Sequence, residues 1–190
     1  MIAIRQERLA DDAAREALLD RAYGPSRFAK TSERLRAGHR PADGLSLVAT
    51  ERGRLVGTVR LWNVTAGPGR SALLLGPLAV DPARRGQGLG AALMNQAIAT
   101  ARRLGHRAVL LVGDAPYYGR FGFSAERTGA LRMPGPYRQE RLLGLELVPG
   151  ALAGVRGLIA AAGTPAEKPD LAALVAAGTK AVTARTRRAA

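Results

Sequence analysis

A glycine-rich turn at residues 81–90 carries groups that could bind an anion. Glycines stand at positions 86, 88 and 90, directly after Arg84 and Arg85. Glycine accepts positive φ and lets a ligand approach the backbone, and guanidinium groups pair with phosphate oxygens. A helix that begins here would have unpartnered N–H groups and a dipole that favours negative charge. Taken alone, the turn is consistent with a phosphate site or with a tight turn that binds nothing.

Residues 114–123 form a second stretch that could do chemistry. Tyr117, Tyr118 and Phe121 fall on one helical turn, directly after Asp114. A tyrosine hydroxyl with an ordinary pKa of about 10 is protonated at neutral pH and can act as a proton donor. The chain has no Cys and only two His, so thiolate or zinc chemistry is improbable and we expect no metal site.

Two apolar runs, at residues 73–80 and 107–113, are typical of strands buried on both faces. Between them, an apolar residue recurs every three or four positions, which predicts an amphipathic helix that connects two parallel strands. The predicted buried face of that helix comprises Leu89, Leu93, Ala97, Ala101 and Leu104.

Gly76-Pro77 interrupts the first of these runs. Proline cannot donate to a ladder, so we expect a bulge or splay at this point. Interrupted pairing would leave neighbouring N–H groups, that of Leu78 first, available to a ligand.

The rest of the chain reads as one mixed α/β domain. We expect a short edge strand at residues 2–5, a helix from its N-cap Asp11 to Tyr23, and a second helix at residues 32–38. Residues 45–51 and 55–62 alternate as a hairpin, with Leu55, Val59 and Leu61 on the face opposite Arg60 and Trp62. A last strand at residues 142–148 would close the sheet.

Arg85-x-x-Gly88-x-Gly90, after a buried strand and before a helix, resembles the pyrophosphate-binding signature of the GNAT superfamily of N-acetyltransferases. Residues 114–123, with a tyrosine ahead of Gly122-Phe123, resemble its second landmark. The likeness covers residues 1–148 and is greatest to small bacterial predicted acetyltransferases. It implies a central, mostly antiparallel sheet splayed in the middle and flanked by helices. It also implies transfer of an acetyl group from acetyl-CoA to a primary amine by direct attack on the thioester.

The resemblance also implies which residues bind acetyl-CoA. The strand backbone at Leu78, Ala79 and Val80 would pair with the pantetheine arm. The diphosphate would lie on the turn, and the tyrosine landmark would complete the site. The implied residues of the turn and landmark are Arg85, Gly86, Gln87, Gly88, Leu89, Gly90, Asp114, Tyr117, Tyr118 and Phe121.

The implied catalytic roles follow the same pattern. The Leu78 N–H would stabilise the developing oxyanion, and Tyr118 would protonate the leaving thiolate, with Tyr117 as the alternative. Glu51 and Asp114 are candidate bases, but a chain of waters serves equally well, and capping of the next helix explains Asp114 best. The early helices would wall the acceptor site, which makes Tyr23, Phe28 and Arg34 candidates for substrate contact, although packing or solvated charge explains each as well.

Composition bounds the remaining possibilities. The 190 residues suggest an acetyl-CoA-binding domain at 1–149 and an Ala/Gly-rich basic extension at 150–190, with a short helix from Asp170 to Val175. No apolar run reaches the about 18 residues that span a bilayer, and no signal peptide is visible, so we expect a cytoplasmic protein that binds no membrane. The net charge of +14 fits an anionic cofactor, nucleic acid or a genomic bias toward arginine.

Three other readings remain open. The scattered arginines argue against nucleic acid. Gly86-x-Gly88-x-x-Ala91 also matches the dinucleotide fingerprint, but five residues separate it from the strand and the following acid, Asp114, comes late. A non-catalytic acyl-CoA sensor would share the cofactor site. The expected partner is a small-molecule or peptide amine, and the sequence leaves a homodimer open.

Overall fold

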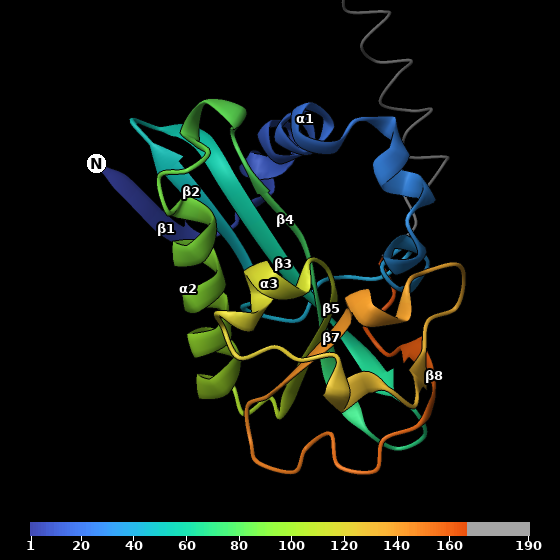
Figure 1. Cartoon of the computed structure of the whole chain (residues 1–190). Coiled ribbons are helices and arrows are strands. Elements are labelled where there is room, and N and C mark those ends of the chain that lie inside the picture. Colours follow the sequence, from blue (N-terminus) through green and yellow to red (C-terminus); the bar gives the residue numbers. More distant parts are fainter. Residues whose placement is uncertain (167–190) are drawn as a thin grey trace, which may run out of the picture.

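The structure, a computed structural model, describes residues 1–166 (Figure 1). Its sheet has the strand order β1-β2-β3-β4-β5-β7, and every neighbouring pair is antiparallel except β4 and β5. The edge strand at the N-terminus, the hairpin and the parallel central pair are therefore confirmed. The strands of this path are β1 (Ile2–Gln6), β2 (Ser46–Glu51), β3 (Arg54–Ala66), β4 (Ser71–Val80), β5 (Ala108–Val112) and β7 (Leu142–Glu146).

Helices cover both faces of the sheet. Helix α2 (Leu89–Arg103) packs on one face, where Leu93 and Ala97 are fully buried against β3 and β4. Helix α1 (Asp12–Tyr23) packs on the opposite face through Leu18 and Leu19. The short helix α3 (Ala115–Gly119) follows β5 and carries the two tyrosines. Leu104 lies beyond the end of α2 and is 43% exposed, so its assignment to the buried face was wrong.

Three local expectations need correction. Asp11 is the N-cap residue of α1, but its side chain makes no capping bond; its carboxylate accepts hydrogen bonds from Arg5 instead, at 2.6 and 2.8 Å. The predicted second helix at residues 32–38 is instead a 3-10 turn, η3 (Thr31–Leu35), which follows another 3-10 turn, η2 (Pro25–Ala29). A register shift between Ala49 and Thr50 places Leu55 on the α1 face, opposite Val59 and Leu61. The bulge reverses the alternation from which its face was predicted.

The central strands part where the sequence predicts a break. β4 pairs with β5 only at Leu73 and Leu74, and beyond that point no residue of β4 has a partner in β5 within the described chain. On the other side, the β3–β4 register shifts between Val59 and Leu61, opposite Gly76-Pro77. Strand β4 therefore presents an open edge from Leu75 to Val80.

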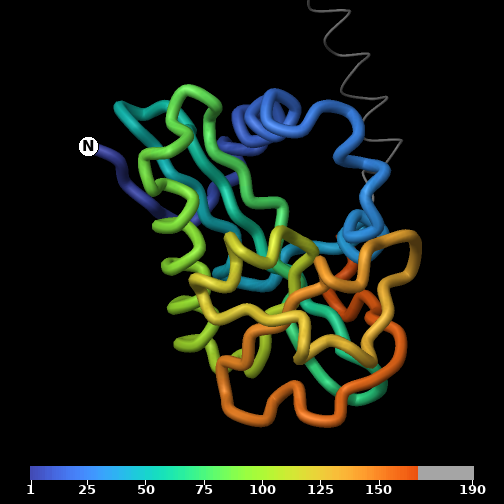
Figure 2. The backbone as a smooth tube through the Cα atoms, in the orientation of Figure 1, coloured from blue at the N-terminus to red at the C-terminus, as the bar shows by residue number. Residues whose placement is uncertain are grey.

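The chain adds two strands that the sequence did not predict. β8 (Gly157–Ala161) pairs antiparallel with the far end of β3 and parallel with β6 (Leu131–Arg132). Figure 2 shows this segment, in orange-red, near the turn that joins β3 to β4. Leu142–Glu146 is thus not the last strand, and Ser124 forms an isolated bridge with Gly144 of that strand. The division at residue 149 stays a prediction, and the helix predicted at 170–175 lies outside the described residues.

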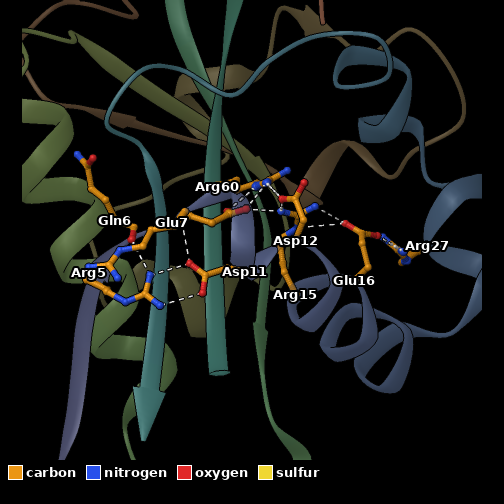
Figure 3. A network of polar contacts seen from close by, with 10 residues as sticks. Arg5, Gln6, Glu7, Asp11, Asp12, Arg15, Glu16, Arg27 and Arg60 are labelled. Carbon is orange, nitrogen blue, oxygen red and sulfur yellow. Dashed lines mark hydrogen bonds and ion pairs between the residues drawn. The ribbon is translucent and has the colours of Figure 1, made fainter. Parts of the chain in front are cut away.

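A buried ion network joins α1 to the sheet (Figure 3). Glu7, whose side chain is 5% exposed, accepts hydrogen bonds from Arg15 of α1 and Arg60 of β3. Arg15 also donates to Glu16 at 2.7 Å, and Arg27 of η2 binds the other oxygen of Glu16. A buried carboxylate is stable only when it is fully paired, as Glu7 is here. The network ties η2 to the sheet.

In the part of the chain described, no helix is long and apolar enough to cross a bilayer.

Candidate active site

The glycine-rich turn leaves β4 at Asp81 and enters α2 at Leu89. Asp81 accepts a hydrogen bond from the N–H of Ala83 at 3.0 Å, which opens a short 3-10 helix, η4 (Pro82–Arg84). Gly86 and Gly88 have φ values of 78° and 77°, which glycine adopts at no steric cost. Gly88 is the N-cap of α2, and no side chain caps this end of the helix. The first N–H groups of α2 are therefore free of a capping side chain.

A hollow of about 320 Å³ lies against this turn, and we call it the turn hollow. Three arginines line it. Arg84 is paired with Glu51, at 3.0 Å from its Nε, whereas Arg85 and Arg120 form no ion pair within residues 1–166. Such a cationic lining beside a helix N-terminus suits an anion. The lining residues are Val80, Arg84, Arg85, Gly86, Gly88, Leu89, Gly90, Ala91, Tyr117 and Arg120.

A second hollow, of about 90 Å³, lies where β4 and β5 part, and we call it the splay hollow. The break in β4 is fixed by two hydrogen bonds to its carbonyl groups. Trp62 of β3 donates from Nε1 to the carbonyl of Gly76 at 2.6 Å, and the hydroxyl of Tyr23 donates to the carbonyl of Leu78. The lining residues are Tyr23, Arg27, Lys30, Ser32, Arg36, Leu75, Gly76, Pro77, Leu78, Val112 and Tyr118.

The two tyrosines of α3 serve different hollows. Tyr117 lines the turn hollow, and a Cβ placed on Gly90 would lie 3.1 Å from its hydroxyl oxygen. Tyr118 lines the splay hollow, with its ring edge-on to that of Tyr117 at 4.9 Å between centroids. Of the two tyrosines of α3, Tyr118 is therefore the one that shares a hollow with Leu78.

Burial, together with the neighbouring hydroxyl of Tyr23, raises the pKa of Tyr118 to about 12. The phenol stays protonated throughout the neutral range, and its hydroxyl makes no hydrogen bond within the described chain. The ring is held by close packing, because a Cβ on Gly113 would lie 2.2 Å from Cε2 of Tyr118. Gly113 thus leaves room for the tyrosine at the end of β5.

Several predicted site residues lie outside the two hollows. Glu51 faces Arg84 and does not line the splay hollow, so the structure does not bring it to the proposed reaction centre. Asp114 is the N-cap of α3, but its side chain makes no capping bond, which corrects the capping explanation. Gln87 and Phe121 line neither hollow, and Ala79 packs against Leu18 and Leu19 of α1.

Among the candidates for substrate contact, only Tyr23 lines the splay hollow. Phe28 is 59% exposed, and Arg34 donates outward to the carbonyl of Pro134 at 2.8 Å. Sequence reasoning missed Lys30 and Arg36 in the splay hollow and Arg120 in the turn hollow. Arg120 follows Tyr117 by three residues and stacks on its ring at 4.5 Å, a spacing that could have indicated it.

No cluster of three His, Asp or Glu side chains suited to a metal ion occurs in residues 1–166. The chemistry supported by the two hollows is instead that of an anion held at the turn and of a protonated phenol beside the open edge of β4. Residues Leu75 to Leu78 line one hollow and Val80 the other, so this edge runs between them.

Comparison with known proteins gives consistent matches. The model of the acetyltransferase (GNAT) family matches residues 11–123. A protein of Escherichia coli K12 described as the uncharacterised N-acetyltransferase YhbS is 34% identical over 161 residues, which cover 82% of this chain and 93% of the relative. The crystal structure of Escherichia coli YhbS in complex with CoA is 32% identical with a TM-score of 0.70, covering 85% of this chain and 89% of that one. A GNAT family acetyltransferase from Brucella melitensis, in complex with acetyl-CoA, is 30% identical with a TM-score of 0.66 and covers 85% of this chain and 96% of that one.

Proposed function

The chain belongs to the GNAT family of acetyltransferases, and from this membership we propose that it transfers the acetyl group of acetyl-CoA to a primary amine by direct attack on the thioester. The observation that carries the proposal is the open edge of β4, with a cationic hollow at its turn end and a phenol-bearing hollow at its break. An extended cofactor would lie along this edge, with its diphosphate on the turn. The relatives crystallised with CoA and acetyl-CoA support this choice of cofactor.

The proposed binding roles divide along the edge. Arg85, Arg120 and the N–H groups at the start of α2 would hold the diphosphate. Tyr117 would contact the cofactor at the turn, and backbone groups of Leu78 to Val80 would pair with the pantetheine arm in place of β5. Arg84 would contribute less, because Glu51 already neutralises it.

The proposed reaction forms a bond between the amine nitrogen and the carbonyl carbon of the thioester and breaks the bond between carbon and sulfur. The N–H of Leu78 would stabilise the oxyanion of the tetrahedral intermediate. Tyr118 would donate its proton to the departing sulfur, and the proton lost by the amine would pass to solvent water. Solvent would then reprotonate Tyr118. We assign no role as base to Glu51, because it lies away from the splay hollow.

Two measurements test this function. Calorimetry should show that the protein binds acetyl-CoA in the micromolar range, and that Arg85→Ala weakens the binding. Free thiol should then appear when the complex is mixed with a panel of primary amines, in proportion to the N-acetylated product. Absence of acetyl-CoA binding would contradict the proposal, whereas binding with no thiol release on any amine would indicate a sensor.

Gly113→Ala is expected to lower kcat about tenfold while acetyl-CoA affinity stays within twofold. The added methyl would overlap the ring of Tyr118 and displace its hydroxyl, and misplacement by about 1 Å is costly in catalysis. Gly119→Ala is the matched control. Gly119 lies on α3, the helix that carries Tyr118, and a Cβ there would meet nothing within 4 Å. Measured in a Tyr118→Phe background, Gly113→Ala should cause no further loss; a full additional tenfold loss would show that Gly113 acts elsewhere.

A further inference from the structure

A buried guanidinium lies at the break in β4. Arg36, just after η3, is only 7% exposed and lines the splay hollow. A Cβ on Gly76 would lie 3.5 Å from its Nη1, so the guanidinium lies against the strand where it splays. Its Nη2 donates to Glu33 at 2.8 Å, but its buried Nε has no hydrogen-bond partner. A buried charged donor without an acceptor is costly, so the fold satisfies this guanidinium only in part.

A second cation lies beside Arg36. The ammonium of Lys30 stands over the ring of Tyr23 at 4.2 Å and forms no ion pair within the described chain. Burial, together with the charges of Arg36 and Arg141, lowers the pKa of Lys30. Lys30 and Arg141 also line an adjoining outer hollow of about 330 Å³, where Arg141 likewise has no acidic partner among residues 1–166.

Neither the splay hollow nor the outer hollow is lined by a carboxylate. Four nearby acids are engaged by arginines: Glu33 by Arg36, Glu16 and Asp20 by Arg27, and Glu140 by Arg138. Asp114, whose charge acts on Tyr118, forms no ion pair within residues 1–166 but lines neither hollow. Lys30 and Arg141 therefore leave an uncompensated positive charge on the face where an acceptor must arrive. An acceptor that carries only a positively charged ammonium group, with no anionic group beside it, would be repelled there.

Resting on the proposed acetyl transfer, we propose that the acceptor is a small molecule whose amine is accompanied by an anionic group, a carboxylate or a phosphonate, held by Arg36 and Lys30. The guanidinium of Arg36, which lines the splay hollow, offers a donor geometry that fits either oxyanion. The splay hollow, of about 90 Å³, suits a compact group. The same cations lower the pKa of the bound amine and so favour the neutral form, which attacks the thioester.

Ligand binding to the CoA-saturated protein tests this proposal apart from turnover. By calorimetry, N-acetylated amino acids with small, polar and aromatic side chains are compared with their primary amides, and N-acetyl-aminomethylphosphonate is added as the phosphonate arm. At least one anionic probe should bind tenfold or more tightly than its uncharged match. The ratio between the two arms identifies the preferred anion, and equal or undetectable binding of charged and uncharged probes overturns the proposal.

Variants locate the anion. Arg36→Gln and Lys30→Met should each remove most of the charge discrimination while acetyl-CoA affinity is unchanged, whereas discrimination that survives both changes overturns the assignment. Arg34→Gln is the control, because Arg34 lies two residues away on η3 and binds the carbonyl of Pro134 outside the hollow. Thermal unfolding checks that each variant is folded.

Thiol release with the matching free amines separates the two proposals. Anion-dependent binding without turnover would leave the anion site at Arg36 and Lys30 standing, but it would contradict the acetyltransferase mechanism and with it the role of the bound molecule as acceptor. Turnover of polyamines at the same efficiency as amino acids would support acetyl transfer and overturn the anionic acceptor.

Discussion

Gly88→Asp is expected to weaken acetyl-CoA binding by about 100-fold or more, which corresponds to about 2.7 kcal/mol. The substitution places a carboxylate at the N-cap of α2, where the proposed diphosphate would meet it. Two negative charges would then compete for the same N–H groups and arginines. Calorimetric titration with acetyl-CoA measures the loss directly.

The control for Gly88→Asp must separate the effect of a carboxylate at the turn from the effect of backbone strain. Gly150→Asp reproduces the strain away from the turn, because Gly150 has a φ of 76°, against 77° for Gly88. A Cβ at either position would meet nothing within 4 Å. Both variants should lose similar free energy of unfolding, but only Gly88→Asp should lose cofactor binding. Wild-type affinity in a folded Gly88→Asp protein would place the diphosphate elsewhere.

Tyr118→Phe is expected to lower kcat by about 100-fold with acetyl-CoA affinity nearly unchanged, because general acid catalysis typically contributes at least this factor. The hydroxyl makes no hydrogen bond within the described chain, so its removal breaks no bond of the fold, and the ring keeps its packing against Phe123. Steady-state rates of thiol release, together with calorimetric affinity, measure the two quantities separately.

Tyr117→Phe is the comparison that decides the assignment. Its hydroxyl lies by Gly90 in the turn hollow, so this variant should alter acetyl-CoA affinity modestly and leave kcat near the wild-type value. A large fall in kcat for Tyr117→Phe, with normal turnover for Tyr118→Phe, would reverse the roles of the two residues.

The elements that the sequence predicted well are determined by residues that are neighbours in the sequence. Leu73 and Leu110 lie in runs apolar on both faces, and both are fully buried in the central strands. Gly76-Pro77 marks the break because proline cannot continue a ladder, and the glycine-rich turn leads directly into α2. In these places the type of a residue directly limits the backbone geometry around it, so the structure can be predicted without knowledge of distant contacts.

The features that the sequence did not predict depend on distant partners. The face of Leu55 is set by a bulge in the pairing with β2, and β8 forms only because Gly157–Ala161 meets the far end of β3. Arg36 lies just after η3, the 3-10 turn that stands where a helix was expected, and Lys30 lies between η2 and η3; both line the splay hollow. Their spacing in the sequence shows no period that would bring them together.

The two hydrogen bonds to the carbonyl groups of Gly76 and Leu78 mean that the gap in the sheet is preorganised. Trp62 and Tyr23 hold these groups through hydrogen bonds within the fold itself, so a ligand that enters need not separate the strands. The conformational entropy of forming the gap is lost once, during folding, and not again at each binding event. In a catalytic cycle, such a rigid slot would let cofactor exchange proceed without rebuilding the sheet.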